Sequence, residues 1–425
     1  MPVTFWCKNK YSNHVISNAL SSMARVRSEV SEVEEIKRKL KVLITTYWYA
    51  PMVNGVVMSV QNLASGLRAM GHDVRVLTVA DGKVSYQKDG IYYMKSLSVN
   101  WFYPNARLPF SNRSFIREIK GWKPDIIHSQ CELFTFNPTI QIAKATQAPI
   151  VHTYHTVYEN YTHYFSPSEK MGRMAAAKFS ELTLNKTMAV IAPSNKVRNM
   201  LLDYGVQSQI FTVPSGIDMH RFEAKADRSE AARLKRELGI PDENTVLINV
   251  GRLAKEKNLD EIITDMTLLP DTISLLIVGE GPYRMQLEDL VSRRGLSGRV
   301  IFTGLIKPEE VAAYYNAGDI FVNASRSETQ GLTYFEAMAC GLPIVCYNDP
   351  CLDDVIINGV NGCLFDSRNE FCDAVRELAA DSARYERMSI LAKDTANRYS
   401  SDTFAKNILD IYYALLDVSS QREVI

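Results

Sequence analysis

Short apolar runs alternate with longer, helix-like segments along most of the chain. The strands predicted for the first series are residues 41–46, 74–79, 126–128, 150–153, 189–192 and 210–213. Between the first two, an amphipathic segment from Ser59 to Met70 ends at Gly71, so a helix is predicted there. Buried strands that alternate with helices are typical of a parallel sheet.

A second series follows the turn at 214–218 and the charged segment 223–237. Its predicted strands are 245–250, 273–279, 300–303, 319–323 and 343–347. We therefore predict an α/β protein with two Rossmann-like domains, each a doubly wound parallel sheet, that face each other across a cleft.

The predicted boundaries follow from these patterns. Residues 1–40 show no clear β-pattern and form an N-terminal extension, 41–222 form the first domain, and 223–400 form the second. Residues 401–425 hold a final helix.

Composition narrows the class of protein. The chain has 425 residues, of which 46% are hydrophobic and 23% are charged, as in a globular protein. No apolar run approaches the roughly 18 residues that span a bilayer, and the polar N-terminus lacks the apolar core of a signal peptide. We expect a cytoplasmic protein that can still bind to a membrane surface.

Charge and cysteines add two expectations. Residues 1–225 carry 27 Lys and Arg against 16 Asp and Glu, whereas residues 226–425 carry 21 against 32. The basic first half either meets an anionic partner or merely complements the second half.

The seven cysteines include no C-x2-C pair and are predicted to be free thiols. The histidines at 128, 152, 155 and 163 lack the carboxylate or thiol partners of a zinc site, so no metal site is expected.

The segment 325–345, SRSETQGLTYFEAMACGLPIV, is the most informative of the chain. Glu328 lies in a polar loop, Gly331 precedes an apolar helix, and Glu336 lies on that helix. A helix start offers unpaired N–H groups and the positive end of a dipole, which suit a phosphate beside a sugar. Two carboxylates and a helix start of this kind are also found in purely structural settings.

Two further segments could hold phosphate. GRLAKEKN at 251–258 follows a predicted strand, and Arg252 and Lys257 could neutralise a diphosphate or be solvated charges at a helix start. Gly55, after the first strand, could let the backbone approach a phosphate or simply form a turn.

Two other segments indicate which kind of ligand the protein binds. VGEGPYR at 278–284 lacks the third glycine of a dinucleotide fingerprint, and Pro282 follows its second glycine, so NAD binding is disfavoured. HTYHTVYENYTHY at 152–164 leaves a strand, and His155 could hydrogen-bond a sugar hydroxyl or be a satisfied, half-buried histidine.

Together these segments resemble glycosyltransferase family 4, whose members have the GT-B architecture and retain the sugar's configuration. The E-x7-E motif corresponds to Glu328 and Glu336, and the G-R-x3-K-x-x-N motif supplies Arg252 and Lys257. The resemblance implies that the final helix crosses back to the first domain. It assigns catalytic roles to Glu328, Arg252, Lys257 and His155, and donor-binding roles to Gly55, Gly279, Ile306, Gly331, Leu332, Thr333 and Glu336.

Residues 155–164 and 327–339 resemble the bacterial diacylglycerol glucosyltransferases within this family. The resemblance implies transfer from UDP-glucose to the 3-hydroxyl of diacylglycerol at the inner face of the cell membrane. It implies no required cofactor or metal, although a divalent metal could stimulate the reaction. Candidate membrane or acceptor residues are Tyr158, Tyr161, Tyr164, Lys170, Arg173 and Lys178. The alternatives are another acceptor, such as phosphatidylinositol, a glycosylated lipid or a soluble glycan, or a non-catalytic partner that binds a nucleotide sugar.

A glycosidase is disfavoured. Residues eight apart on a helix are about 12 Å apart, beyond the roughly 5–9.5 Å that hydrolytic carboxylate pairs need.

Overall fold

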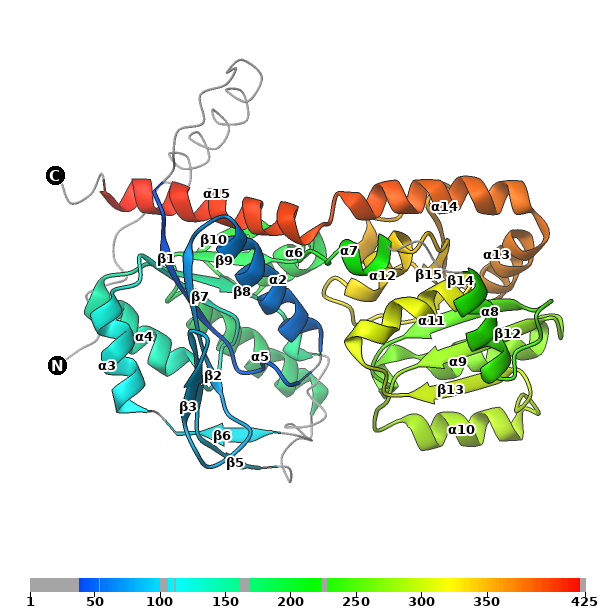
Figure 1. Cartoon of the computed structure of the whole chain (residues 1–425), viewed down its shortest axis with the longest axis horizontal. Coiled ribbons are helices and arrows are strands. Elements are labelled where there is room, and N and C mark those ends of the chain that lie inside the picture. Colours follow the sequence, from blue (N-terminus) through cyan, green and yellow to red (C-terminus); the bar gives the residue numbers. More distant parts are fainter. Residues whose placement is uncertain are drawn as a thin grey trace, which may run out of the picture. The chain divides into compact units, whose positions relative to one another are not determined.

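The structure is a computed structural model that describes residues 38–52, 54–99, 106–110, 112–159, 168–223 and 228–420 (Figure 1). Residues 1–37, which make up nearly all of the predicted N-terminal extension, lie outside this range. So do Tyr161, Tyr164 and the last five residues of the chain.

The first half of the chain forms an eight-stranded sheet with the order β10-β9-β8-β7-β1-β2-β4-β3. All neighbours pair in parallel except β3 and β4. The strands are β1 (Lys41–Thr45), β2 (Asp73–Val79), β3 (Tyr86–Lys88), β4 (Ile91–Met94), β7 (Ile126–Ser129), β8 (Ile150–Thr153), β9 (Ala189–Ala192) and β10 (Gln209–Thr212). A separate hairpin joins β5 (Ser96–Ser98) to β6 (Arg107–Pro109).

Helices alternate with these strands and flank the sheet (Figure 1). They are α2 (Gly55–Ala69), α3 (Arg113–Trp122), α4 (Phe136–Thr146), α5 (Glu169–Leu184), α6 (Asn195–Asp203) and the short α7 (His220–Glu223). The helix predicted from Ser59 begins four residues earlier, at Gly55. The prediction was wrong because Asn54 caps the helix, its side chain accepting from the N–H of Val57 at 2.9 Å.

The second half forms a six-stranded parallel sheet with the order β13-β12-β11-β14-β15-β16. Its strands are β11 (Thr245–Val250), β12 (Ile273–Val278), β13 (Val300–Gly304), β14 (Ile320–Asn323), β15 (Ile344–Tyr347) and β16 (Gly362–Phe365). Its α-helices are α8 (Arg228–Glu237), α9 (Leu259–Asp265), α10 (Arg284–Arg293), α11 (Val311–Ala317), α12 (Leu332–Ala339), α13 (Arg368–Ala380), α14 (Ser382–Asn397) and α15 (Ser401–Ser420). The 3-10 turns are η2 (Lys255–Lys257), η3 (Met266–Leu268), η4 (Pro308–Glu310) and η5 (Pro350–Leu352).

Both faces of the second sheet are covered by apolar cores. Leu247 and Leu275 point into one core, whereas their neighbours Ile248 and Leu276 point into the other. Alternate residues of a strand point to opposite faces, so a sheet with two cores must have helices on both sides. The predicted doubly wound α/β fold is therefore confirmed, and each predicted strand has an observed counterpart.

The final helix lies against the first half. Tyr412 of α15 hydrogen-bonds the buried His128 of β7, with 2.6 Å between the hydroxyl and Nδ1. A Cβ added to Gly66 of α2 would overlap the Cβ of Ala405, so α2 and α15 pack closely there. The domain limits inferred from the sequence stay a prediction.

In both sheets the order reverses beside the first strand, at β11 and β14 in the second sheet and at β1 and β7 in the first. Ligands of open α/β sheets bind outside the carboxyl ends of the strands at such reversals.

Candidate functional site

At the reversal of the second sheet, the structure joins Lys257 to Glu328. Lys257 ends η2, which follows β11, and Glu328 lies in the loop between β14 and α12. Their Nζ and Oε1 atoms are 2.6 Å apart, and the side chains are 29% and 13% exposed. The loop is also tied to η2 by the Ser327 hydroxyl, which donates to the carbonyl of Glu256 at 3.2 Å.

This pair sets the charge of Glu328. Burial alone would raise the pKa of its carboxyl, but the charge and hydrogen bond of Lys257, a hydrogen bond from Ser325 and the charge of Lys196 together bring that pKa below its usual value. Glu328 is therefore a carboxylate at neutral pH, able to accept hydrogen bonds from hydroxyl groups.

Arg252 also follows β11, but its guanidinium does not join the pair. Its Nη1 lies 3.9 Å from Oε1 of Glu256, and 37% of its side chain is exposed. Of the two predicted cations, Lys257 contacts Glu328, and Arg252 lies near Glu256.

The start of α12 lies beside the first half of the chain. No side chain caps this helix, and its first residue follows Gly331 in the left-handed region, with φ of 76°. A Cβ at Gly331 would overlap the ring of Tyr334, so only glycine fits there. A Cβ at Gly55 would lie 3.8 Å from Cδ1 of Leu332, which brings two predicted donor-binding positions together. Thr333, the next residue of α12, is half-buried.

Glu336, the second carboxylate of the motif, is held from α11. The hydroxyl of the fully buried Tyr315 donates to its Oε2 at 2.8 Å. Burial raises the pKa of Glu336, and the bond from Tyr315 only partly offsets this effect.

Gly279 and Ile306 line the ends of the neighbouring strands. A Cβ at Gly279 would overlap the carbonyl of Gly251, so the loops after β11 and β12 need glycine for their close approach. This packing explains Gly279 independently of the donor-binding role predicted for it. Ile306 follows β13 and is half-buried against the apolar core that includes Ile248.

At the reversal of the first sheet, His155 contacts Gln130. Its Nε2 lies 2.6 Å from Oε1 of Gln130, which follows β7. Burial lowers the pKa of His155 to about 4, so the imidazole is neutral at pH 7. Because a carbonyl oxygen can only accept, Nε2 carries the proton here and Nδ1 is left as an acceptor.

Glu132, a buried carboxylate close to His155, was not predicted as a site residue from the sequence. Glu132 accepts from the hydroxyl of Tyr158 at 2.7 Å and contacts Nε2 of His152 at 3.0 Å. A carboxylate three residues past a strand was the available signal, but only the fold shows that it is buried against β8. The ring of Tyr158 packs edge-on against Phe179.

The predicted basic residues lie on α5 with exposed apolar neighbours. Lys170 is exposed, Arg173 pairs with Glu169 at 2.5 Å, and Lys178 pairs with Glu181 at 2.6 Å. Met171 and Met174 of the same helix are 68% and 65% exposed.

Three further properties of the described residues concern metal sites, disulfides and membrane-spanning helices. No group of three or more His, Cys, Asp or Glu side chains among them could hold a metal ion. Their six cysteines are free. None of their helices is both long and apolar enough to cross a bilayer.

Comparison with known families covers most of the chain. Residues 53–221 match the family described as Glycosyltransferase Family 4, and residues 230–395 match Glycosyl transferases group 1.

Two similar proteins are named alpha-monoglucosyldiacylglycerol synthase. The one from Streptococcus pneumoniae is 31% identical over 91% of this chain and 88% of its own length. The one from Acholeplasma laidlawii is 29% identical over 88% of this chain and 97% of its own length.

Solved structures share the fold. The Anabaena protein Alr3699/HepE in complex with UDP and glucose has a TM-score of 0.72 and 19% identity, and it covers 88% of this chain and all of its own. Sucrose-phosphate synthase from Thermosynechococcus elongatus also has a TM-score of 0.72, with 22% identity. The match covers 89% of this chain and all of that protein's chain. With the two parallel sheets and the matched segments, these similarities show that the chain belongs to glycosyltransferase family 4 and has the GT-B architecture.

Proposed function

We propose that this glycosyltransferase moves glucose from UDP-glucose to the 3-hydroxyl of 1,2-diacylglycerol, with retention of configuration. The ion pair between Glu328 and Lys257 at the reversal of the second sheet is the observation that carries the proposal. It places a carboxylate that can hold sugar hydroxyls next to a cation that can meet a diphosphate. The product would be alpha-monoglucosyldiacylglycerol, which would serve the synthesis of membrane glycolipids and of the lipoteichoic acid anchor.

The proposed step breaks the bond between C1 of the sugar and the oxygen of the diphosphate, and it forms a bond from C1 to the acceptor oxygen. Lys257, Arg252 and the uncapped start of α12 stabilise the charge that collects on the leaving diphosphate. The acceptor hydroxyl approaches from the same face and gives its proton to the leaving phosphate oxygen. No nucleophile from the protein is required.

The roles proposed for the other site residues rest on the family to which the chain belongs. We assign Glu328 to the sugar hydroxyls, Glu336 to the ribose, and His155 to the donor sugar through its Nδ1. Gly55, Gly279, Ile306, Gly331, Leu332 and Thr333 would line the donor site. Because side chains and a helix start neutralise the diphosphate, the proposal requires no divalent metal, and excess EDTA should not abolish turnover.

Two observations support a lipid acceptor at a membrane surface. Relatives at 31% and 29% identity are named for monoglucosyldiacylglycerol synthesis. In addition, α5 presents exposed methionines beside basic residues, a combination that suits an anionic membrane surface. We propose peripheral binding to the inner face of the cell membrane on this basis.

A different donor or acceptor is the second candidate. A GDP-mannose-dependent alpha-mannosyltransferase from Corynebacterium glutamicum is 28% identical over 91% of this chain and 92% of its own length. A sulfoquinovosyl transferase from Arabidopsis thaliana is 31% identical over 82% of this chain and 68% of its own length. For this protein to have either activity, its site would have to accept a donor other than UDP-glucose.

The test is to incubate the purified protein with diacylglycerol vesicles and, separately, UDP-glucose, UDP-galactose or GDP-mannose. Release of the nucleoside diphosphate and the structure of the lipid product are measured. An α-glucosyl lipid formed only with UDP-glucose supports the proposal, and a Glu328→Ala variant should lose this activity. A product from another donor, or UDP release without a lipid product, contradicts the assigned donor or acceptor.

A further inference from the structure

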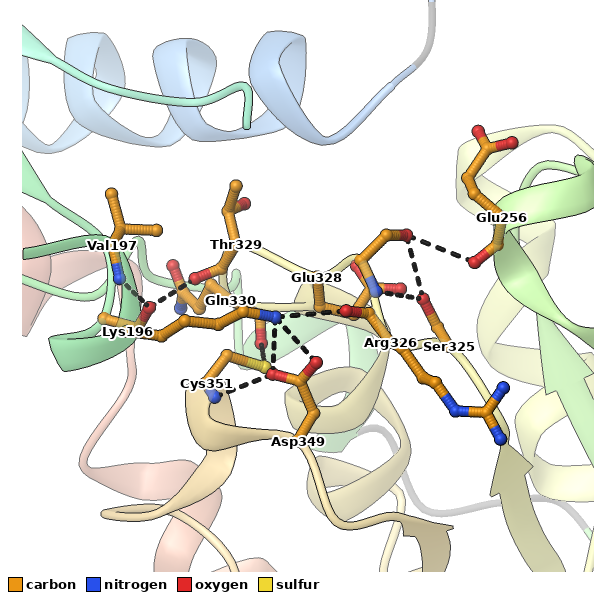
Figure 2. Close-up of polar contacts among 12 residues, drawn as sticks. Lys196, Val197, Glu256, Ser325, Arg326, Glu328, Thr329, Gln330, Asp349 and Cys351 are labelled. Carbon is orange, nitrogen blue, oxygen red and sulfur yellow. Dashed lines mark hydrogen bonds and ion pairs between the residues drawn. The ribbon is translucent and has the colours of Figure 1, made fainter. Parts of the chain in front are cut away.

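Side chains from the first half of the chain hold the loop that carries Glu328 (Figure 2). Lys196, on α6, donates from Nζ to the carbonyl oxygen of Arg326 at 3.2 Å. Ser194, which caps α6, donates from Oγ to the carbonyl oxygen of Thr329 at 2.6 Å. Glu328 lies between these two carbonyl groups, so its backbone is tethered on both sides.

Lys196 has a second partner, the carboxylate of Asp349. Its Nζ lies 2.8 Å and 2.6 Å from the two oxygens of this side chain, which is only 2% exposed. Asp349 follows β15 and also accepts from the N–H of Cys351 at 2.8 Å, which fixes its orientation. Because a buried carboxylate is costly without its partner, the ammonium group of Lys196 is held where it reaches the loop.

Gln330 adds a third connection between the same parts of the chain. Its Oε1 accepts from the N–H of Ser215 and its Nε2 donates to the carbonyl of Ser215, both at 2.8 Å. Gln330 is buried. The contacts to Arg326, Thr329 and Gln330 therefore fix the loop before and after Glu328.

The opposite side of the loop meets η2, where Lys257 binds the Glu328 carboxylate. The placement of that carboxylate thus depends on two sets of contacts, one from η2 and one from α6. The hydrogen bonds of Lys196 go to Asp349 and to a backbone carbonyl, so it holds Glu328 in place through the backbone of the loop, and its charge also helps to lower the pKa of the Glu328 carboxyl.

We propose that Lys196, paired with Asp349, is a positioning residue that fixes the 325–330 loop so that Glu328 meets the donor sugar. The inference rests on the proposed role of Glu328 in sugar transfer.

The first measurement is hydrogen exchange of the loop, which needs no substrate. In Lys196→Met, the amides of peptides covering 325–331 should exchange about tenfold faster, because the loop loses a tether. Lys144→Met, which changes an exposed lysine at the end of α4, is the matched control and should leave that exchange unchanged.

The second measurement separates positioning from stability. Lys196→Met leaves the Asp349 carboxylate buried and unpaired, so its Tm should fall. The double variant Lys196→Met/Asp349→Asn removes that charge and should recover most of the Tm. Its kcat/KM for UDP-glucose should nevertheless stay at least about tenfold below wild type, because small misplacements of a binding group cost this much or more.

Recovery of kcat/KM together with Tm in the double variant would overturn the inference, since the role of Lys196 would then be purely structural. Unchanged loop exchange in Lys196→Met would overturn it as well. Full activity of Glu328→Ala would instead remove the proposed function on which the inference rests, and the exchange measurement distinguishes the two failures.

Discussion

The two carboxylates of the E-x7-E motif have opposite electrostatic surroundings. Burial raises the pKa of both, but the ion pair with Lys257, the hydrogen bond from Ser325 and the charge of Lys196 together more than offset this effect at Glu328, whereas the hydroxyl of Tyr315 does so only in part at Glu336. Environments that push the pKa values of two carboxylates apart allow them different roles. Glu328 is the more strongly ionised of the two.

The pH dependence of stability tests this difference. The pKa of Glu328 is lower in the folded protein than its usual 4.5, so the ionised group stabilises the fold above that pH, and the contribution is lost as pH falls through the folded pKa. Glu328→Gln should lower the free energy of unfolding by about 1 kcal/mol at pH 7, and by less below pH 4.5. Urea unfolding at several pH values measures this.

Glu309→Gln, which alters an exposed carboxylate in η4, is the control for that experiment. It should change the free energy of unfolding little at any of these pH values. A loss in Glu328→Gln that stayed constant from pH 7 to pH 4 would contradict an ion pair formed by an ionised Glu328.

Tyr315→Phe tests how Glu336 is held. The substitution removes one hydroxyl and leaves the ring, so KM for the donor should rise about tenfold, in line with the loss of one hydrogen bond to a charged group. Tyr314→Phe changes the adjacent, half-buried tyrosine and serves as the control. Equal KM values for the two variants would contradict the role of Tyr315.

At the level of elements, the loops that follow the strands are packed against one another. The loop after β12 touches the loop after β11 at Gly279, where a side chain would overlap the carbonyl of Gly251. The position of Arg252, the next residue, therefore depends on a glycine in a different loop.

Gly279→Ala should lower the free energy of unfolding by about 3 kcal/mol, because the added methyl group overlaps backbone and the φ of 141° disfavours any side chain. Gly298→Ala is the matched control, since nothing lies within 4 Å of a Cβ there. Denaturant titration compares the two, and similar free energies of unfolding would contradict the close approach of the two loops.

At the scale of the whole molecule, both sheets have the same strand order around their first strand. Gly55 and His155 follow strands at or near the reversal of the first sheet, and Lys257 and Glu328 do so in the second. The candidate site therefore draws on equivalent positions of two similar sheets.

Membrane binding is also a property of the whole molecule. Met171→Glu/Met174→Glu should weaken binding to anionic vesicles at least about tenfold, because two exposed apolar side chains on α5 become charged. Ile390→Glu alters a residue of α14 that is 62% exposed and should leave the affinity unchanged. Sedimentation with vesicles measures both, and equal binding of the two variants would contradict a role for α5.

Much of the architecture could be predicted without coordinates. Buried strands and amphipathic helices have local periodicities, so every strand proposed from the apolar runs is present. The short strands β3, β4, β5, β6 and β16 were not among the predicted strands. The start of α2 was misplaced because the cap at Asn54 outweighed the hydrophobic pattern.

The α/β class, the family and the segments that carry charge after the strands could be predicted without coordinates, because they depend on patterns and motifs within short stretches. Which side chains meet could be learned from the folded structure alone. Glu328 meets Lys257 across 71 positions, and Lys196 meets Asp349 across 153. Such contacts depend on the order of strands in a sheet and on the packing of one half of the chain against the other, and no local pattern encodes either.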